Sequence, residues 1–165
     1  MRMNSPCWGR YPVAHQQLLR LNDRHATLPK LEGRALPRGN GRSYGDSCLN
    51  DGGTLLLTRG LDRLIGFDPS SGLLECEAGV LLSEILDLIV PQGWFVPVTP
   101  GTKFVTVGGA IANDVHGKNH HQVGSFGHHL KALSSFVLME PDVGAAQPST
   151  PNGSPRPLVA WGSPG

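Results

Sequence analysis

The sequence predicts an α+β fold built from short elements around a core of its own, and one observation supports each part of this description. Segments typical of short strands occur between helix-like segments, without the regular alternation that a parallel, doubly wound sheet requires. Glycine accounts for 22 and proline for 14 of the 165 residues, a content that predicts many turns and short elements. The chain is also long enough to bury a core of its own.

The N-terminal elements are expected to be a helix and a strand. Val13–His25 is expected to form a short amphipathic helix, because Leu18, Leu19 and Leu21 supply one apolar side. Gly53–Thr58 reads "GTLLLT" and predicts a short apolar strand.

A hairpin is expected next, over residues 63–79. Its turn is Asp68–Gly72, which contains the Pro, Ser and Gly residues typical of turns. The second arm alternates apolar and acidic residues, the period of a half-buried strand. The apolar members are Leu74, Cys76 and Ala78, and the acidic ones are Glu75 and Glu77.

Two further helices and a strand follow. Leu81–Gly93 predicts a helix of about ten residues, stopped by Pro91 and Gly93. Trp94–Val98 predicts a short strand. The segment from Thr106 predicts a helix with small residues in its first turn and Thr106 as its N-cap.

The last strand is expected over Leu130–Glu140, after which the composition changes. Residues 141–165 are rich in proline and glycine and have no apolar periodicity, which predicts a disordered tail. The expected division is therefore a domain over residues 1–140 and a tail over 141–165. Either a natural tail or a truncation or shifted reading frame after Glu140 accounts for this change.

Charge and cysteine content exclude several classes of protein. A net charge of +1 creates no basic field for nucleic acid, and no segment approaches the roughly 18 apolar residues of a membrane span. The N-terminus lacks an apolar core of signal-peptide length. Cys7, Cys48 and Cys76 are odd in number and have no paired spacing, which favours free thiols in a reducing compartment. The expected location is the cytoplasm.

The segment Leu36–Asn50, "LPRGNGRSYGDSCLN", has the composition of an anion-binding loop. Its glycines allow close backbone approach to a ligand, and its arginines supply fixed positive charge. A Walker loop is excluded because the segment contains no lysine. The dinucleotide fingerprint is excluded because the spacing is G-x-G-x-x-x-G and a strand, not a helix, follows. A loop that wraps a pyrophosphate without a helix remains, beside the alternative of a glycine-rich connection with exposed arginines.

A second segment, Pro100–His121, supports the pyrophosphate interpretation. Gly101 and Thr102 form a turn, and Gly108 and Gly109 lie where a helix is expected to begin. Free amides at a helix start attract anions. Two segments far apart in the sequence are therefore expected to close on one diphosphate.

Five histidines lie between residues 116 and 129 and raise the alternative of a metal site. Their spacing matches no common ligand motif, and Asp114 is the one carboxylate close by. No metal is therefore expected. His116 is expected to donate a hydrogen bond to a ligand or the backbone, and the others are expected at the surface or behind the site: His120, His121, His128 and His129.

Four motifs together resemble a known family. In order, they are "RGNGRSYGD", "VPVTPGT", "TVGGAIANDVHGKNHH" and "GSFG". The resemblance covers roughly Leu18 to Met139 and is to the PCMH-type FAD-binding domain of the vanillyl-alcohol oxidase and p-cresol methylhydroxylase superfamily. Within it, the chain is most similar to the group typified by decaprenylphosphoryl-β-D-ribose oxidase. Some members bind FAD covalently through a histidine in the first loop, where this chain has Arg42-Ser43-Tyr44. The resemblance therefore implies non-covalent FAD.

The resemblance also implies roles for individual residues. The first loop would wrap the FAD diphosphate, with Ser43 and Tyr44 near the isoalloxazine. Gly101 would touch the flavin, the segment from Thr106 would present backbone amides, and the segment from Asn113 would line the flavin-ribityl region. His116 and Lys118 would face the substrate. The implied cofactor-binding residues are Pro37, Arg38, Gly39, Asn40, Gly41, Arg42, Ser43, Tyr44, Gly45, Asp46, Ser47, Gly101, Thr106, Val107, Gly108, Gly109, Asn113, Asp114, Val115 and His116.

The implied activity is oxidation of a sugar or polyol carbon that bears a hydroxyl, by hydride transfer to FAD. The family substrate can be lipid-linked, and a partner reductase can complete the reaction sequence. The match ends at Glu140, before the rest of the FAD domain and the substrate domain of such enzymes, which implies a fragment with little or no turnover. Two alternatives to a flavin oxidoreductase remain at this point: a non-catalytic nucleotide-binding module and an inactive truncated product.

Overall fold

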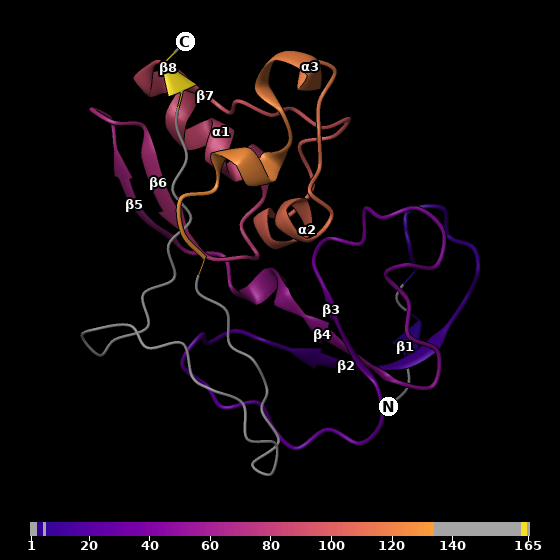
Figure 1. Cartoon of the computed structure of the whole chain (residues 1–165). Helices are drawn as coiled ribbons and strands as arrows, with labels where there is room; N and C mark the ends of the chain where they lie inside the picture. The colour runs from indigo at the N-terminus through magenta and orange to yellow at the C-terminus, as the bar shows by residue number, and fades with distance from the viewer. Residues whose placement is uncertain (1–2, 5, 134–162, 165) are drawn as a thin grey trace, which may run out of the picture.

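The computed structural model describes residues 3–4, 6–133 and 163–164. Figure 1 shows the parallel strands in the lower half of the molecule and the hairpin with the three α-helices in the upper half. The strands are β1 (Met3–Asn4), β2 (His15–Arg20), β3 (Ala35–Arg38), β4 (Thr54–Leu57), β5 (Leu64–Asp68), β6 (Leu73–Cys76), β7 (Trp94–Phe95) and β8 (Ser163–Pro164). The α-helices are α1 (Leu82–Ile89), α2 (Val107–Ala112) and α3 (His120–Val123), and 3₁₀ helices cover Thr58–Gly60, Val90–Gln92 and Phe126–His129.

The mixture of short helices and strands confirms the α+β class. One sheet has the order β1-β2-β4-β3, with β4 parallel to both β2 and β3 and β1 antiparallel to β2. Thr54, Leu55 and Leu56 of β4 are all buried. This continuous burial is typical of a central strand in a parallel sheet. The predicted strand Gly53–Thr58 is therefore confirmed.

The helix predicted over Val13–His25 is wrong, because this segment contains strand β2. Gln17 of β2 pairs with Thr54 of β4 and Arg20 pairs with Leu57. The side chain of Gln16 is fully buried, and its Oε1 accepts a hydrogen bond of 2.8 Å from the amide of Asn50. Sheet pairing with the buried β4 strand outweighs the helical preference of the leucines.

The predicted hairpin is confirmed, with β5 antiparallel to β6 and the turn at Asp68–Gly72. The alternating burial holds for Leu74 and Cys76 but not beyond the end of β6, where Glu77 is buried and Ala78 is exposed. Gly72 lies against the ring of Trp94, whose Nε1 donates a 3.0 Å hydrogen bond to the carbonyl of Pro69.

The helices α1 and α2 occur where the sequence predicts them. α1 ends at a 3₁₀ turn that contains Pro91, and Gly93 follows with φ of 81°. The hydroxyl of Thr106 accepts a 3.1 Å hydrogen bond from the amide of Gly109, which confirms Thr106 as the N-cap of α2. None of the helices in residues 6–133 has the length and hydropathy that a membrane crossing requires.

The main core lies between the hairpin, α1 and α2. It includes Val80, Val98 and Phe126, each at most 1% exposed. The strand predicted over Leu130–Glu140 is not found in its described part, because residues 130–133 have no regular secondary structure and their backbone pairs with no strand. Residues 134–140 lie outside the described residues, as does the predicted tail apart from Ser163–Pro164. Those two residues pair antiparallel with β7.

Candidate functional site

The glycine-rich loop begins where edge strand β3 ends. Pro37 is tolerated in β3 because, among the described strands, β3 pairs with β4 alone. Arg38 is the last residue of β3, and its Nη2 donates a 2.6 Å hydrogen bond to the carbonyl of Pro6. A Cβ on Gly41, whose φ is 63°, would lie 2.3 Å from that same nitrogen. Glycine at this position thus lets the arginine side chain cross the loop backbone.

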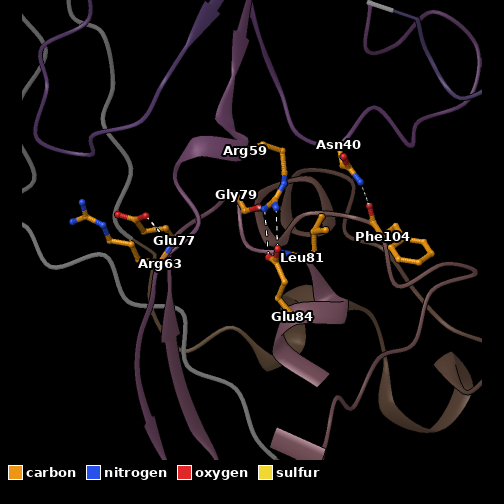
Figure 2. A network of polar contacts seen from close by, with 8 residues as sticks. All are labelled: Asn40, Arg59, Arg63, Glu77, Gly79, Leu81, Glu84 and Phe104. Carbon is orange, nitrogen blue, oxygen red and sulfur yellow. Dashed lines mark hydrogen bonds and ion pairs between the residues drawn. The ribbon is translucent and has the colours of Figure 1, made fainter. Parts of the chain in front are cut away.

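The loop makes direct contact with the segment that leads into α2. The side-chain amide of Asn40 donates a 2.8 Å hydrogen bond to the carbonyl of Phe104 (Figure 2). One residue earlier, a Cβ on Gly39 would lie 2.2 Å from the Oγ1 of Thr106. The two segments that the sequence predicts to converge therefore do meet, at a point where glycine is needed for the approach.

The backbone amides of the loop have no acceptor among the described residues, although Gly41 itself is buried. Across the described residues, none of the backbone amides from Gly39 to Ser47 donates a hydrogen bond within the protein. Gly41 and Gly45 have φ of 63° and 62°, which turns the backbone at both positions. Ser47 donates from its hydroxyl to the carbonyl of Tyr44 at 2.9 Å, and the Tyr44 ring is 81% exposed. Runs of unpaired amides around such turns form anion-binding concavities.

Arg42 adds a positive charge beside these amides. Its guanidinium carbon lies 4.8 Å from the ring centroid of Trp8 and 5.9 Å from that of Phe104. Its Nε is buried and has no hydrogen-bond partner among the described residues. Sequence reasoning missed both rings: Phe104 lies inside the second segment, but nothing in the sequence connects Trp8 to the loop.

The backbone amides in the first turn of α2 already donate hydrogen bonds within the protein. The amides of Val107 and Gly108 donate 2.8 Å hydrogen bonds to the carbonyls of Val80 and Ala78. The amide of Gly109 is occupied by the Thr106 hydroxyl. Each amide has one proton, so a ligand oxygen at any of them would have to displace an acceptor of the protein itself. Gly101, also predicted for this face, is exposed and has open space beside it.

The segment from Asn113 to Lys118 lies at the opposite end of α2 from the glycine-rich loop. Asn113 caps the helix through a 2.8 Å hydrogen bond from its side-chain amide to the carbonyl of Gly109. Val115 is half-buried, whereas His116 and Lys118 are exposed. In the described structure no hydrogen bond, ion pair or ring contact joins this segment to residues 39–47. The predicted site residues thus form two groups separated by α2.

Asp114 closes the loop that follows α2. Its carboxylate accepts 2.8 Å hydrogen bonds from the amide of Gly127 and the hydroxyl of Ser125. The Gly127 amide, and next the Ser125 hydroxyl, hold the pKa of Asp114 below its ordinary value. Asp114 has φ of 40°, a conformation that Asp adopts more readily than most residues.

The histidines lie close to one another without forming a metal cluster. The ring centroids of His116 and His120 are 5.2 Å apart, and those of His120 and His121 are 6.0 Å apart. His128 Nδ1 lies 3.2 Å from the amide of Ser125. Within residues 6–133, no group of three or more His, Cys, Asp or Glu side chains is placed to hold an ion.

A polar network beside the site was not found from the sequence. The Arg59 guanidinium donates to the carbonyl of Gly79 and, at 2.9 Å, to the carboxylate of Glu84 (Figure 2). Glu84 also accepts a 2.7 Å hydrogen bond from the amide of Leu81 at the start of α1. These contacts join the turn after β4 to α1. Arg59 and Glu84 pair with each other, so this network indicates no catalytic role.

Comparisons with known proteins identify the kind of domain. Residues 26–137 match the sequence model of a family described as FAD binding domain. The chain is 41% identical over 133 residues to decaprenylphosphoryl-β-D-ribose oxidase of Mycolicibacterium smegmatis, an alignment that covers 76% of this chain and 29% of that protein. It is 29% identical over 113 residues to D-2-hydroxyglutarate dehydrogenase of Escherichia coli, covering 68% of this chain and 11% of that one.

The fold also matches a solved structure. A structure of alkyldihydroxyacetonephosphate synthase superposes with a TM-score of 0.52 at 18% sequence identity, covering 61% of this chain and 20% of that one. This likeness concerns the fold alone. In each comparison, the chain spans less than a third of the length of the similar protein.

Proposed function

Because the chain belongs to the FAD-binding-domain family, with residues 26–137 inside the family match, we propose that its glycine-rich loop binds the diphosphate of FAD. The junction between Asn40 and Phe104 carries this proposal, since it brings the loop against the segment before α2. FAD is the cofactor that this family implies, and two groups of residues are proposed to hold it.

The loop fits a diphosphate on three counts. Its amides have no acceptor within the described residues, its glycines let a ligand approach the backbone, and Arg42 adds a guanidinium with a buried, unpartnered Nε. Phosphate oxygens are acceptors without protons, so amide and guanidinium donors match them. We assign the diphosphate to Gly39–Ser47, with Pro37 and Arg38 supporting the loop from β3. The absence of a histidine from this loop supports non-covalent binding.

The segment beyond α2 is assigned to the flavin and substrate end. Asn113, Asp114 and Val115 would border the flavin-ribityl region, and the exposed His116 and Lys118 would remain free to meet a substrate. Val115 is packed against the core and Asp114 is tied to Ser125 and Gly127, so the backbone that carries His116 is held in place.

The proposed reaction is oxidation of a sugar or polyol carbon that bears a hydroxyl. The relatives are named for a ribose derivative, for 2-hydroxyglutarate and, in a D-lactate dehydrogenase of Anaerostipes hadrus at 28% identity, for lactate. All three contain such a carbon, and the ribose enzyme has the greatest identity among them. FAD supplies the two-electron redox chemistry when it is bound. The chain contributes binding, orientation and donors to the phosphates.

The partners and compartment are proposals of the same kind. A lipid-linked sugar is a candidate substrate because the relative of 41% identity is named for one, and a separate reductase is a candidate partner. The buried, free thiols of Cys7, Cys48 and Cys76 suit a reducing compartment such as the cytoplasm. We also propose that residues 1–140 form the partial FAD domain and that residues 141–165 form a tail, of which Ser163–Pro164 pair with β7.

Two measurements on the purified chain test this function. Titration with FAD, followed by flavin fluorescence, should saturate at one FAD per chain. Anaerobic addition of sugar phosphates, polyols and 2-hydroxy acids to the loaded protein should then bleach the flavin absorbance with at least one of them. Binding without bleaching would favour a non-catalytic nucleotide-binding module, and failure to bind FAD would refute the proposal.

A further inference from the structure

The Arg42 guanidinium contacts two aromatic rings that come from different parts of the chain. Trp8 belongs to the N-terminal segment before β2, and Phe104 belongs to the segment before α2. The two rings are 53% and 47% exposed. Neither ring belongs to the main core or packs against it.

The stack leaves the donors of Arg42 unused. Its Nε is buried without a partner, and its terminal nitrogens make no hydrogen bond to any described residue. A guanidinium that contacts aromatic rings retains its planar fork of N–H groups, which matches two phosphate oxygens at once. Cation–π contacts hold the group in orientation without occupying those donors.

The surroundings favour an anion. Lys103 Nζ lies 5.8 Å from the centroid of the Phe104 ring, so a second positive charge borders the stack. Arg38 donates to the carbonyl of Pro6, which ties the N-terminal segment to the glycine-rich loop two residues before Trp8. The unpaired amides of Gly39–Ser47 belong to the same loop as Arg42.

We propose that Trp8 and Phe104 are positioning residues that fix the Arg42 guanidinium as a phosphate-binding group. The N-terminal segment is then a third wall of the site, in addition to the glycine-rich loop and the segment before α2. The phosphate can belong to the cofactor diphosphate or to a phosphorylated substrate. The first source rests on the proposed function, and the two are separated by experiment.

Isothermal titration of the full chain tests this inference. The probes are inorganic pyrophosphate, FAD, and ribose 5-phosphate added to FAD-loaded protein. The variants are Trp8→Leu, Phe104→Leu and Arg42→Lys, with Trp8→Phe as the conservative replacement. Phe95→Leu is the matched control, because Phe95 is also 50% exposed but lies on β7. Circular dichroism establishes that each variant is folded.

The Leu and Lys variants should weaken binding of at least one probe about three- to tenfold, the range that cation–π contacts account for. Trp8→Phe should restore most of this loss, and Phe95→Leu should bind like wild type. If the variants lose affinity for pyrophosphate and FAD, Arg42 binds the phosphate of the cofactor. If they lose affinity for ribose 5-phosphate alone, Arg42 binds the phosphate of the substrate.

Contrary outcomes separate the two proposals. Wild-type affinity for all three probes in folded Trp8→Leu, Phe104→Leu and Arg42→Lys overturns the positioning role and leaves the proposed function standing. Pyrophosphate binding that depends on Trp8 and Arg42, in a chain that does not bind FAD, supports the positioning role and refutes the proposed function. A chain that binds none of the probes refutes both.

Discussion

The side-chain amide of Asn40 donates a 2.8 Å hydrogen bond to the backbone carbonyl of Phe104. This contact joins the glycine-rich loop after β3 to the segment that leads into α2, across a long separation in the sequence. Gly39 and Thr106 are in contact beside it. The junction therefore joins the loop that carries the unpaired amides and Arg42 to the segment that leads into α2.

Replacement of Asn40 by Ala should weaken FAD binding. The variant loses one hydrogen bond, typically worth about 0.5 to 1.5 kcal/mol, so the Kd for FAD should rise about two- to tenfold. Gln92→Ala is the matched control, because Gln92 also donates from a side-chain amide to a carbonyl, that of Leu88 at 2.9 Å, but near the end of α1. Equal FAD affinity in Asn40→Ala and wild type would show that the junction does not support the site.

Replacement of Gly39 by Ala should destabilise the fold through Thr106. The new Cβ would lie 2.2 Å from the threonine Oγ1, and such overpacking typically costs about 1 to 3 kcal/mol. The check is a double-mutant cycle in chemical denaturation with Thr106→Ala, which removes the clashing hydroxyl and methyl. Gly39→Ala should cost less in the Thr106→Ala background than in wild type. Equal costs in both backgrounds would contradict the contact.

Replacement of Gly72 by Ala should destabilise the hairpin. Gly72 has φ of 71°, and a Cβ there would lie 2.2 Å from the ring of Trp94. Left-handed backbone strain and the clash together should lower the free energy of unfolding by about 2 kcal/mol or more. Gly66→Ala, on strand β5 of the same hairpin with open space beside it, should change it by less than about 1 kcal/mol. Thermal unfolding that ranks the two variants in the opposite order would contradict this packing.

Asp114 should stabilise the protein at neutral pH and lose this effect in acid. Its pKa is lowered in the folded state by the Gly127 amide and the Ser125 hydroxyl. Because the folded protein favours the ionised form, the stabilisation is fully present above the ordinary carboxyl pKa of about 4 and disappears as pH falls through the lowered pKa.

The variant Asp114→Asn tests this, because Asn tolerates the φ of 40° found at this position. Its free energy of unfolding should be below that of wild type at about pH 6, and the difference should shrink as the pH falls below about 4. A difference that stays constant from about pH 6 to about pH 3 would show that the carboxylate is not responsible.

The sequence correctly predicted those elements whose conformation is determined by residues within a few positions of one another. The hairpin turn at Asp68–Gly72, the end of α1 near Pro91 and the Thr106 cap are all determined by neighbouring residues, and all three are found. The prediction of a helix over Val13–His25 was wrong. This segment forms a strand because it pairs with β4, and local periodicity gives no information about that pairing.

The sequence likewise predicted only the part of the candidate site that depends on local signals. Glycine content indicated both segments that meet at Asn40 and Phe104, and the family motifs implied FAD as the cofactor. The sequence does not reveal that the amides of Val107 and Gly108 are already bonded to the carbonyls of Val80 and Ala78. It also does not reveal Trp8 beside Arg42, because that contact arises only from the tertiary fold.

Hydrogen exchange of the loop amides with and without FAD tests the central claim most directly. In the free protein, the amides from Gly39 to Ser47 lack acceptors among the described residues and should exchange rapidly. Addition of saturating FAD should slow their exchange, while amides of the hairpin turn at Asp68–Gly72 should remain unchanged. If FAD binds but exchange between Gly39 and Ser47 does not slow, the diphosphate lies elsewhere and the account is wrong.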